Sequence, residues 1–507
     1  MHDDALRHLY DEVESWAQWL LGDLEPEYVR APKVLRDAVH GFHLMAPHEV
    51  AIIDSPLLQR LRHIHQTALA YLVYPTANHT RFDHSLGVAS VAAKMACALR
   101  EVRQAPEVSL DVVRDLRLAG LLHDVGSSLF SHLSEAIIAD RYRDMFSDIK
   151  RMEFKGRGRF FQKAEVGEII SYAIVTCPRT RRFLLEALHK HDISDDDIVD
   201  RVAGLIVGQP PDNGLQFMAD IINGPFDADK IDYLLRDCHF SGIRADVDPE
   251  RIYYTLDIIR ENGWSAYLTV QTGGIPHLEQ VLLAKMMLYT GIYHHHKIRT
   301  LECMVRAVFE TIDEDPDAIS AEHLKFRSIG DFLKVSEYDW FSMGLREQRL
   351  SEPVKQILDR RLLKRALVIS RSTIQTPTLP LLPELHILRE QGPQAVRELR
   401  DQIHSALPQS HRRGVRHLWI DIPPPPKIDE DANNCWVLLD GEPKPLSSIF
   451  PSADWLRSYV ANKWRAHVFY VSEREARRVA HGVAAQVLQD RFGLRFNRLA
   501  RAPCKLD

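Results

Sequence analysis

The sequence predicts a mainly α-helical protein, with an all-helical core and a smaller C-terminal α+β unit. Through about the first three-quarters of the chain, apolar residues recur at helical spacing and few runs alternate as strands do. After Leu362 the pattern changes to short β-type runs around a polyproline spacer at 423–426. We therefore expect an N-terminal helical segment over 1–32, a core over 33–362 and the C-terminal unit over 363–507.

Hydrophobic periodicity then predicts the individual elements in chain order. Apolar stripes predict helices over residues 6–24, 56–72, 86–103, 110–123, 164–174, 198–207, 228–235, 278–293 and 298–312. In the C-terminal unit, β-type runs predict strands over residues 366–370, 415–422, 435–439 and 466–471. A capping box of Ser472 and Glu475 then predicts a last helix that ends near Gly493, which argues for a folded unit rather than a tail.

The composition is that of an ordinary soluble globular chain, with 45% hydrophobic and 26% charged residues and a formal net charge of −6. It excludes the disordered, collagen-like and small secreted classes. The opening MHDDALRHLY is acidic where a secretory signal needs a basic start, and no run reaches the roughly 20 apolar residues of a membrane helix. We therefore expect a cytoplasmic protein with no membrane partner. The six cysteines form no CxxC pair, so neither a disulfide framework nor a thiolate zinc site is expected.

The unusual count of 25 histidines makes a metal site the next question. His123 and Asp124 are adjacent at the expected end of a packed helix, where both side chains can reach one ion. Alone, the pair is a weak signal, because a histidine oriented by its neighbour gives the same dipeptide. His84 upstream and Asp229 downstream complete a set of two imidazoles and two carboxylates. Such a set suits one Mn²⁺, Fe²⁺, Zn²⁺ or Mg²⁺ ion, with positions left for water and substrate.

Several long motifs in a fixed order then point to a family. They are IIDSPLLQRLRHIHQ, VYPTANHTRFDHSLGV, LAGLLHDVG, FSH and GPFDADKIDYLLRDCHFSGI. Over about residues 33–300 the chain resembles the HD-domain phosphohydrolases, and among them the deoxynucleotide triphosphohydrolase branch. The resemblance implies that one divalent metal ion is held by His84, His123, Asp124 and Asp229. It also implies hydrolysis of deoxynucleoside triphosphates (dNTPs) to deoxynucleoside and triphosphate.

The same resemblance assigns residues to the substrate. Arg81, Lys230 and Tyr233 would face the phosphates and the sugar, and Arg and Lys donors can stabilise the charge of a triphosphate. Simpler interpretations stay open, since Arg81 could pair with Asp83 or Asp229 and Tyr233 could be a core aromatic residue.

Three further residues match pocket positions of the family. Asp237 would accept a hydrogen bond from a sugar hydroxyl, or else form a structural salt bridge. Gln66 would contact the substrate, or else lie as an amide on a helix surface. His132, in the FSH segment, would protonate the departing 5′ oxygen, although a lone histidine is usually structural. The expected catalytic set is Arg81, Asp124, His132 and Lys230.

Two positions depart from the family pattern. Most members continue HDxGH, whereas this chain reads HDVGS, with Ser127 in the last place. The family's downstream His-Glu pair falls on Ala164 and Glu165, so the glutamate remains and the histidine does not. Loss of a general acid or base typically lowers a rate by about 10²- to 10⁴-fold. We expect a slower triphosphohydrolase, an enzyme for another phosphoester or a nucleotide-binding regulator, and no second metal ion.

The resemblance extends to regulation by a nucleotide effector. Five residues fall where SAM-and-HD-domain enzymes hold an activating nucleotide between subunits, namely Lys33, Val34, Asp54, Gln59 and Arg62. Asp54 could accept hydrogen bonds from a guanine edge and Arg62 could meet the base or phosphates, but an ordinary helix-start pair of these two residues is an equal alternative. An effector site of this kind implies a homo-oligomer, either a dimer or a tetramer.

The run IYHHHKIR holds three consecutive histidines. Neighbouring residues of a helix diverge around its axis, so these histidines cannot all bind one ion. His296 and Lys297 match family positions near the substrate region, and we expect His294 and His295 to lie behind them or at the surface.

Two other functions stay open. A phosphodiesterase or nuclease would use the same metal, with the basic segment 150–163 guiding a single-stranded nucleic acid, although a flexible solvated connection explains that segment equally well. A nucleotide sensor with weak chemistry would explain Ser127 and Ala164. The sequence has no Walker loop, GxSxG elbow or Cys-His nucleophile pattern that would favour another enzyme class.

Overall fold

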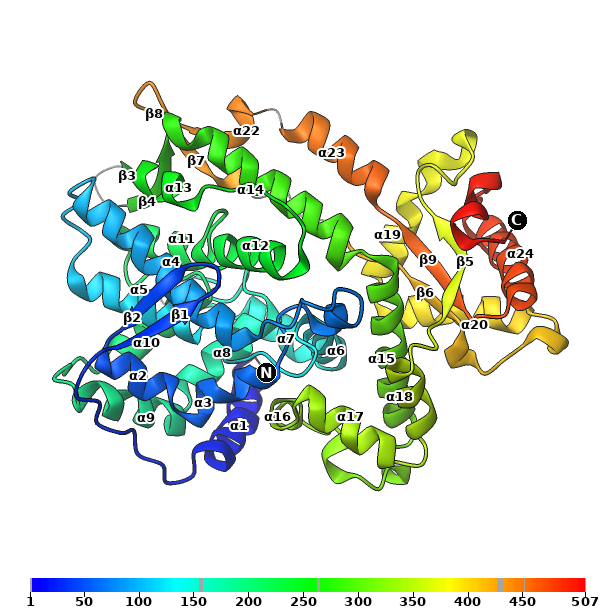
Figure 1. The fold of residues 1–507 in the computed structure, drawn as a ribbon, viewed down its shortest axis with the longest axis horizontal. Helices are drawn as coiled ribbons and strands as arrows, with labels where there is room; N and C mark the ends of the chain where they lie inside the picture. Colours follow the sequence, from blue (N-terminus) through cyan, green and yellow to red (C-terminus); the bar gives the residue numbers. More distant parts are fainter. Residues whose placement is uncertain (1, 155–157, 262–264, 426–431, 451, 507) are drawn as a thin grey trace. The chain divides into compact units, whose positions relative to one another are not determined.

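The computed structural model describes residues 2–154, 158–261, 265–425, 432–450 and 452–506 (Figure 1). It confirms the mainly α-helical fold, to which a few small sheets are added. The chain divides into two compact units. The larger unit comprises Met1–Met287, Phe326–Trp340 and Ile428–Pro451, and the smaller unit comprises Leu288–Lys325, Phe341–Lys427 and Ser452–Asp507. The boundaries expected after residues 32 and 362 stay predictions.

Helix α4 (Arg81–Glu101) forms the centre of the larger unit and is buried along nearly its whole length. Its first turn is fixed by a capping box, because Thr80 and Asp83 each accept a hydrogen bond from the other's backbone N–H. Helix α5 (Leu110–Leu122) packs closely against it at Gly120, where a Cβ would lie 2.9 Å from the backbone nitrogen of Ala89. This close packing sets the end of α5 beside the N-terminal half of α4.

The larger unit contains many further helices. They are α1 (His2–Leu21), α2 (Pro47–Ile53), α3 (Pro56–Gln59), α6 (His132–Arg141), α7 (Arg143–Arg151), α8 (Val166–Thr176), α9 (Pro178–His189), α10 (Ile198–Ile206), α11 (Gln216–Asn223), α12 (Ala228–Ser241), α13 (Pro249–Thr255), α14 (Ile275–Leu288), α16 (Ile329–Lys334) and α22 (Leu446–Ile449). Helix α17 (Glu337–Arg346) begins in this unit.

Two sheets belong to the larger unit. Strands β1 (Lys33–Asp37) and β2 (Gly41–Met45) form an antiparallel hairpin. The second sheet has the strand order β3-β4-β7-β8, from β3 (Leu256–Glu261), β4 (Ser265–Gln271), β7 (Trp436–Leu439) and β8 (Glu442–Pro445). Strand β7 pairs in parallel with β4, with Trp436 opposite Thr269, so a late segment of the chain completes a sheet begun much earlier.

The smaller unit has the predicted α+β character. Its antiparallel sheet has the order β5-β9-β6, from β5 (Lys364–Ile369), β6 (Trp419–Asp421) and β9 (Ala466–Tyr470). Its helices include α15 (His296–Glu314), α18 (Ser351–Leu358), α19 (Pro383–Glu390), α20 (Pro393–Ala406), α23 (Ser452–Lys463) and α24 (Arg474–Phe492). Helix α24 ends at Gly493 in the left-handed conformation, as predicted, but its N-cap is Glu473 without a side-chain bond, so the predicted capping box is wrong.

The single helix predicted over 56–72 is wrong. The segment consists of α3, two short 3-10 turns and an extended stretch between them. His65 pairs with Thr80 in an isolated β-bridge, and Ala68 has a positive φ of 49°. The residues of the apolar stripe are buried, as the pattern predicts, but backbone hydrogen bonds to residues 79–81 interrupt the helix. The buried members of the stripe are Leu57, Leu61, Ile64 and Leu69.

Other predicted elements differ mainly in their ends. The helix predicted over 278–293 ends as α14 and continues as a π-turn over Tyr289–Tyr293. The strand predicted over 415–422 is shortened to β6, which follows a 3-10 turn. Helix α7 takes up the start of the basic segment 150–163, and Phe160 and Phe161 are buried against Phe154 and Tyr172. The described part of this segment is thus anchored, while residues 155–157 lie outside the described residues.

Over the described ranges, no helix combines the length and the apolar character needed to cross a membrane.

Candidate metal centre

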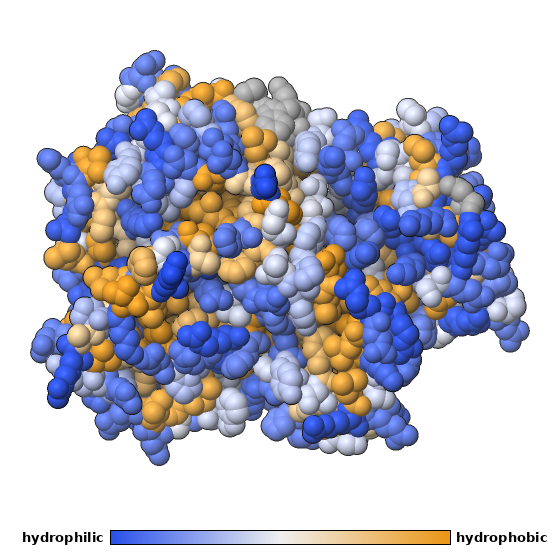
Figure 2. Space-filling model, viewed as in Figure 1, coloured by the Kyte–Doolittle hydropathy of each residue, from blue (hydrophilic) through white to orange (hydrophobic). Residues whose placement is uncertain are grey.

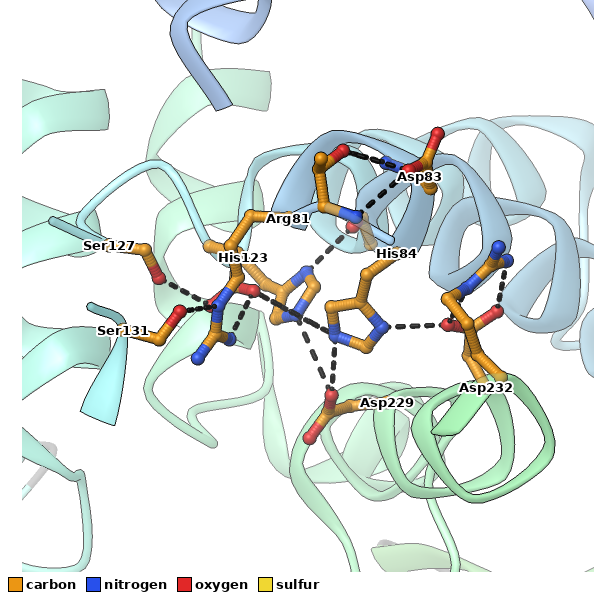
Figure 3. Close-up of polar contacts among 12 residues, drawn as sticks. Arg81, Asp83, His84, His123, Ser127, Ser131, Asp229 and Asp232 are labelled. Carbon is orange, nitrogen blue, oxygen red and sulfur yellow. Dashed lines mark hydrogen bonds and ion pairs between the residues drawn. The ribbon is translucent and has the colours of Figure 1, made fainter. Parts of the chain in front are cut away.

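Three helix ends meet at one point in the larger unit (Figure 3). His84 lies in the first turn of α4, His123 is the C-cap of α5, and Asp229 lies in the first turn of α12. One donor atom from each of these residues lies within 4.8 Å of the other two. Asp124, directly after His123, borders the group with Oδ2 at 3.8 Å from His84 Nε2 and 3.7 Å from His123 Nε2.

The spacing of these donors fits one divalent cation. The Nε2 atoms of His84 and His123 are 3.2 Å apart, and Asp229 Oδ1 is 2.9 Å from His84 Nε2 and 3.7 Å from His123 Nε2. Donors that lie about 2.1 Å from one ion, at angles of roughly 90–125°, are themselves about 3.0–3.7 Å apart. Imidazole and carboxylate donors suit the divalent ions expected from the sequence. The predicted ligands are therefore brought together, with Asp124 at the edge of the group.

Each imidazole is held by its other nitrogen. His84 Nδ1 lies 2.7 Å from Asp232 Oδ2, and His123 Nδ1 lies 2.8 Å from the Gly120 carbonyl oxygen. Because these acceptors take the Nδ1 proton, Nε2 is in both residues the atom that can bind a cation. Partners of this kind orient histidine ligands and raise their basicity.

Asp232 joins the groups behind the metal centre. Its carboxylate accepts hydrogen bonds from Nε and Nη2 of Arg236, both at 2.9 Å, and its Oδ1 lies 2.6 Å from His40 Nε2. Arg236 also meets Asp37 at 2.9 Å. Burial alone would raise the pKa of Asp232, but Arg236, His40 and His84 hold it well below its usual range. The carboxylate therefore stays charged and fixes His84.

Asp232, Arg236 and Gly87 were not predicted as part of the site from the sequence. A Cβ at Gly87, on α4, would lie 1.8 Å from Asp232 Oδ1 and 2.4 Å from Arg236 Nη2, so glycine is what lets α12 place this ion pair against α4. A signal was present in DADKIDYLLRD, where Asp229, Asp232 and Arg236 follow at spacings of three and four residues on one helix face.

The charge state of His84 makes cation binding depend on pH. Burial opposes protonation, but Asp229 and Asp232 outweigh it and raise the pKa of His84 to about 10. Below that pH a cation must displace a proton, so we expect Mn²⁺ affinity to rise between pH 6 and 8, by up to about tenfold per unit for each proton released. Titration calorimetry in buffers of different ionisation enthalpy counts these protons, and an affinity that is flat with pH would contradict the ligand assignment.

Arg81 lies beside the metal centre and is 4% exposed. Its Nη1 donates to Asp124 Oδ2 at 2.6 Å, and its Nε donates to Ser131 Oγ at 3.0 Å. Its Nη2 is 3.3 Å from His132 Nε2. The alternative pairing with Asp83 does not form, because Asp83 is used in the capping box of α4. Arg81 thus connects a candidate ligand to the candidate general acid.

His132 begins α6, with an imidazole that is 79% exposed. Its Nδ1 lies 3.0 Å from Glu135 Oε2, and Glu135 Oε1 accepts the Gly167 N–H at 2.7 Å. The two residues before it, Phe130 and Ser131, have positive φ values of 58° and 50°. Such conformations cost about 1–3 kcal/mol each and persist where surrounding structure enforces them, often at functional sites.

The predicted substrate residues differ in how they are engaged. Gln66 is 6% exposed, and its Oε1 has no hydrogen-bond partner in the part of the chain that the structure describes. Asp237 lies 2.7 Å from His79 Nε2. Lys230 Nζ donates to Asp227 Oδ2 at 2.6 Å and to the Gly224 carbonyl at 2.7 Å. Tyr233 is half-buried on α12. Gln66 is buried and lies in a turn, so the alternative of an amide on a helix surface is wrong.

The two departures from the family pattern have definite surroundings. Ser127 Oγ donates to Asp124 Oδ1 at 3.1 Å. Ala164 is buried, and Glu165 is the N-cap of α8, where its backbone N–H donates to Glu168 at 2.9 Å. Burial raises the pKa of Glu168 to about 8, with Glu165 and Glu135 as further causes.

The expected effector residues form two exposed pairs. Lys33 Nζ meets Asp54 Oδ2 at 2.7 Å, and Arg62 Nε donates to Gln59 Oε1 at 2.8 Å. Asp54 and Arg62 therefore each pair with another residue, rather than with each other as the alternative expected. Val34, on β1, is 62% exposed. The other family-matching pair, His296 and Lys297, begins α15 in the smaller unit with His294 and His295 directly before it.

Family models match two parts of the chain. The family model of the HD domain matches residues 81–200, and that of the HD-associated region matches residues 247–491. An uncharacterized protein of Methanocaldococcus jannaschii is 27% identical over 447 residues, which cover 87% of this chain and 80% of that protein. A crystal structure of a hypothetical protein from Aquifex aeolicus has a similar fold, with a TM-score of 0.59 and 22% identity over 89% of this chain and 99% of that one.

Several of the similar proteins have a named activity, and two of them serve as examples. The deoxynucleoside triphosphate triphosphohydrolases SAMHD1 of Gallus gallus and Homo sapiens are 29% and 26% identical to this chain over 55% and 59% of its length. The match spans 45% and 48% of those two enzymes, so the chain covers about half of their length.

Proposed function

Because the chain belongs to the HD-domain family, we propose that it is a metal-dependent phosphohydrolase that converts dNTPs to deoxynucleoside and triphosphate. One observation carries the proposal: a buried arginine, Arg81, lies between the candidate ligand Asp124 and the exposed imidazole of His132. Metal ligands, a fixed cation and an acid-base group within one site are what hydrolysis of a phosphate ester needs.

A divalent cation held by His84, His123, Asp124 and Asp229 would supply a Lewis acid for phosphoryl oxygens and lower the pKa of a nucleophilic water. Arg81 and Lys230 bind phosphoryl oxygens and stabilise their developing charge. Gln66, Tyr233 and Asp237 bind the nucleoside part of the substrate.

His132 supplies the proton in this proposal. Its Nδ1 lies 3.0 Å from Glu135 Oε2, which orients the ring, and Nε2, which lies 3.3 Å from Arg81 Nη2, is the nitrogen that would exchange a proton with the departing 5′ oxygen. The family histidines at 127 and 164 are replaced by serine and alanine, so His132 carries this step without their help and we expect a slow enzyme.

The test of the function is product analysis. Purified protein loaded with Mn²⁺ is incubated with each dNTP, each NTP and a labelled single-stranded nucleic acid, and the products are identified by mass spectrometry. Deoxynucleoside plus triphosphate supports the proposal. Nucleoside monophosphates released from the strand would instead identify a nuclease, and nucleotide binding without product would identify a sensor.

We expect His132→Gln to lower the turnover by about 10²- to 10⁴-fold while Mn²⁺ content stays at the wild-type level, because a proton donor is lost and no ligand is removed. Turnover with saturating substrate and metal content by elemental analysis are compared. His189→Gln is the matched control, since His189 is also an exposed histidine paired with a carboxylate, Asp196, at 3.0 Å. Equal turnover of the two variants would reject the role of His132.

The homo-oligomer and its nucleotide effector remain part of the proposal. The outer face of the β1–β2 hairpin supports them, because Val34, Phe42 and Leu44 are 62%, 70% and 61% exposed. Hydrophobic residues gather over this hairpin in the surface view (Figure 2). Apolar side chains exposed together are typical of protein–protein contacts. Of the candidate effector residues, Lys33 begins β1 of this hairpin and forms an ion pair with Asp54, the C-cap of α2.

A further inference from the structure

A buried glutamate far away in the sequence contacts the turn that precedes His132. Glu337, the first residue of α17, is 3% exposed. Its Oε1 accepts the backbone N–H of Phe130 at 3.2 Å and that of His65 at 3.1 Å. Its Oε2 lies 2.6 Å from His65 Nδ1. Three donors from two separate segments of the larger unit therefore converge on this carboxylate.

The segments held by Glu337 carry the strained turn of the site. Phe130 and Ser131 both have left-handed φ values, which non-glycine residues rarely adopt. The Phe130 ring is buried edge-on against Trp340, one turn after Glu337 on α17, with ring centroids 5.0 Å apart. Helix α17 thus contacts this turn through the Glu337 carboxylate and the Trp340 indole.

A chain of hydrogen bonds leads from Glu337 to Arg81. The backbone carbonyl of His65 accepts the hydroxyl of Ser131 at 2.6 Å, so the Ser131 oxygen is turned to accept from Arg81 Nε at 3.0 Å. Arg81 then donates to Asp124 at 2.6 Å. Every group in this chain is linked to the next by an observed contact, from α17 to the candidate metal ligand.

We propose that Glu337 is a positioning residue for the phosphate-binding arginine: through His65 and Ser131 it fixes the Arg81 guanidinium between Asp124 and His132. The inference rests on the proposed function, because it assigns Arg81 to the substrate phosphates. It also gives the C-terminal region a part in the site, since Glu337 lies in the HD-associated region rather than in the HD domain. Misplacement of a catalytic group by about 1 Å can lower activity by about 10²-fold.

The variants for the test are Glu337→Gln, Ser131→Ala and the two combined. Glutamine keeps the size of the side chain but has one acceptor oxygen where three donors converge, so the turn loses a bond without a cavity. Glu347→Gln is the matched control. Glu347 is 5% exposed and also accepts two backbone N–H groups, from Ser320 at 2.8 Å and Ala321 at 3.2 Å, but it belongs to the smaller unit.

Two quantities are measured on the Mn²⁺-loaded full-length protein: the affinity for inorganic triphosphate by calorimetry, and kcat and KM for the dNTP that the wild-type protein hydrolyses best. We expect Glu337→Gln to weaken triphosphate binding and lower kcat by up to about 10²-fold, while Mn²⁺ stays bound because no ligand is removed. Because both residues act through Arg81, the combined variant should lose no more than the worse single variant.

The outcomes separate the inference from the function on which it rests. Additive losses in the combined variant, or a Glu337→Gln protein equal to Glu347→Gln in triphosphate affinity, would overturn the role of Glu337. A loss of Mn²⁺ binding in Glu337→Gln would overturn it as well, by showing a general effect on the site. A wild-type protein that binds triphosphate but hydrolyses no nucleotide would refute the proposed function, while the binding cycle still decides the role of Glu337.

Discussion

His123→Ala should abolish Mn²⁺ binding at concentrations that saturate the wild-type protein, and with it the hydrolysis of any nucleotide. The substitution removes one of the two Nε2 donors that face each other at 3.2 Å, and leaves His84 with carboxylates alone. Loss of an outer partner of a metal ligand already costs about 10- to 100-fold in affinity or activity, so loss of a ligand itself costs more. Metal content by elemental analysis and product formation are the measurements.

The fold should survive this change. The contact that His123 makes through Nδ1 is a single hydrogen bond to the Gly120 carbonyl, and such bonds contribute about 0.5–1.5 kcal/mol. His277→Ala, on α14, is the control for removing a half-buried histidine elsewhere in the larger unit. A His123→Ala protein that retains its metal would exclude His123 as a ligand. One that loses the metal yet keeps full activity would exclude metal-dependent chemistry.

The metal donors could be predicted from the sequence because short motifs carry them at helix ends. His84 lies just before a predicted helix and His123 ends an apolar one, so local patterns indicated both places, while the resemblance to the HD-domain phosphohydrolases completed the candidate ligand set. The same local patterns gave helices and strands whose ends shift by a few residues. They were wrong over 56–72, where pairing of His65 with Thr80 competes with helix formation and cannot be read from an apolar stripe.

The parts that could not be predicted are contacts between distant segments. Glu337 meets His65 across 272 positions of the chain, and neither residue stands in a pattern that names the other. Strand β7 joins β4 in the same way, since a short apolar run predicts a strand but not its neighbour. Asp232 was visible within DADKIDYLLRD, but its role became clear from its contacts with His84 and Arg236.

Gly87→Ala should destabilise the protein and weaken Mn²⁺ binding together, although alanine normally favours a helix over glycine. The added Cβ would lie 1.8 Å from Asp232 Oδ1, and this carboxylate cannot turn away without leaving Arg236 and His84. Overpacking of a core costs about 1–3 kcal/mol, and disrupting a buried ion pair costs more. We expect the free energy of unfolding to fall by at least about 2 kcal/mol, and Mn²⁺ affinity to fall by about 10- to 100-fold.

The same substitution at Gly482 supplies the control. Gly482 lies within α24, where a Cβ would meet nothing within 4 Å, so alanine there should stabilise the protein by about 0.5–1 kcal/mol. Denaturant unfolding and Mn²⁺ calorimetry on both variants separate helix propensity from the contact with Asp232. If Gly87→Ala lowers stability but leaves Mn²⁺ affinity unchanged, Asp232 supports the fold without orienting His84. If both quantities stay at the wild-type values, α4 and α12 do not approach as closely as the Asp232–Arg236 pair requires, and the convergence of His84 with Asp229 loses its structural basis.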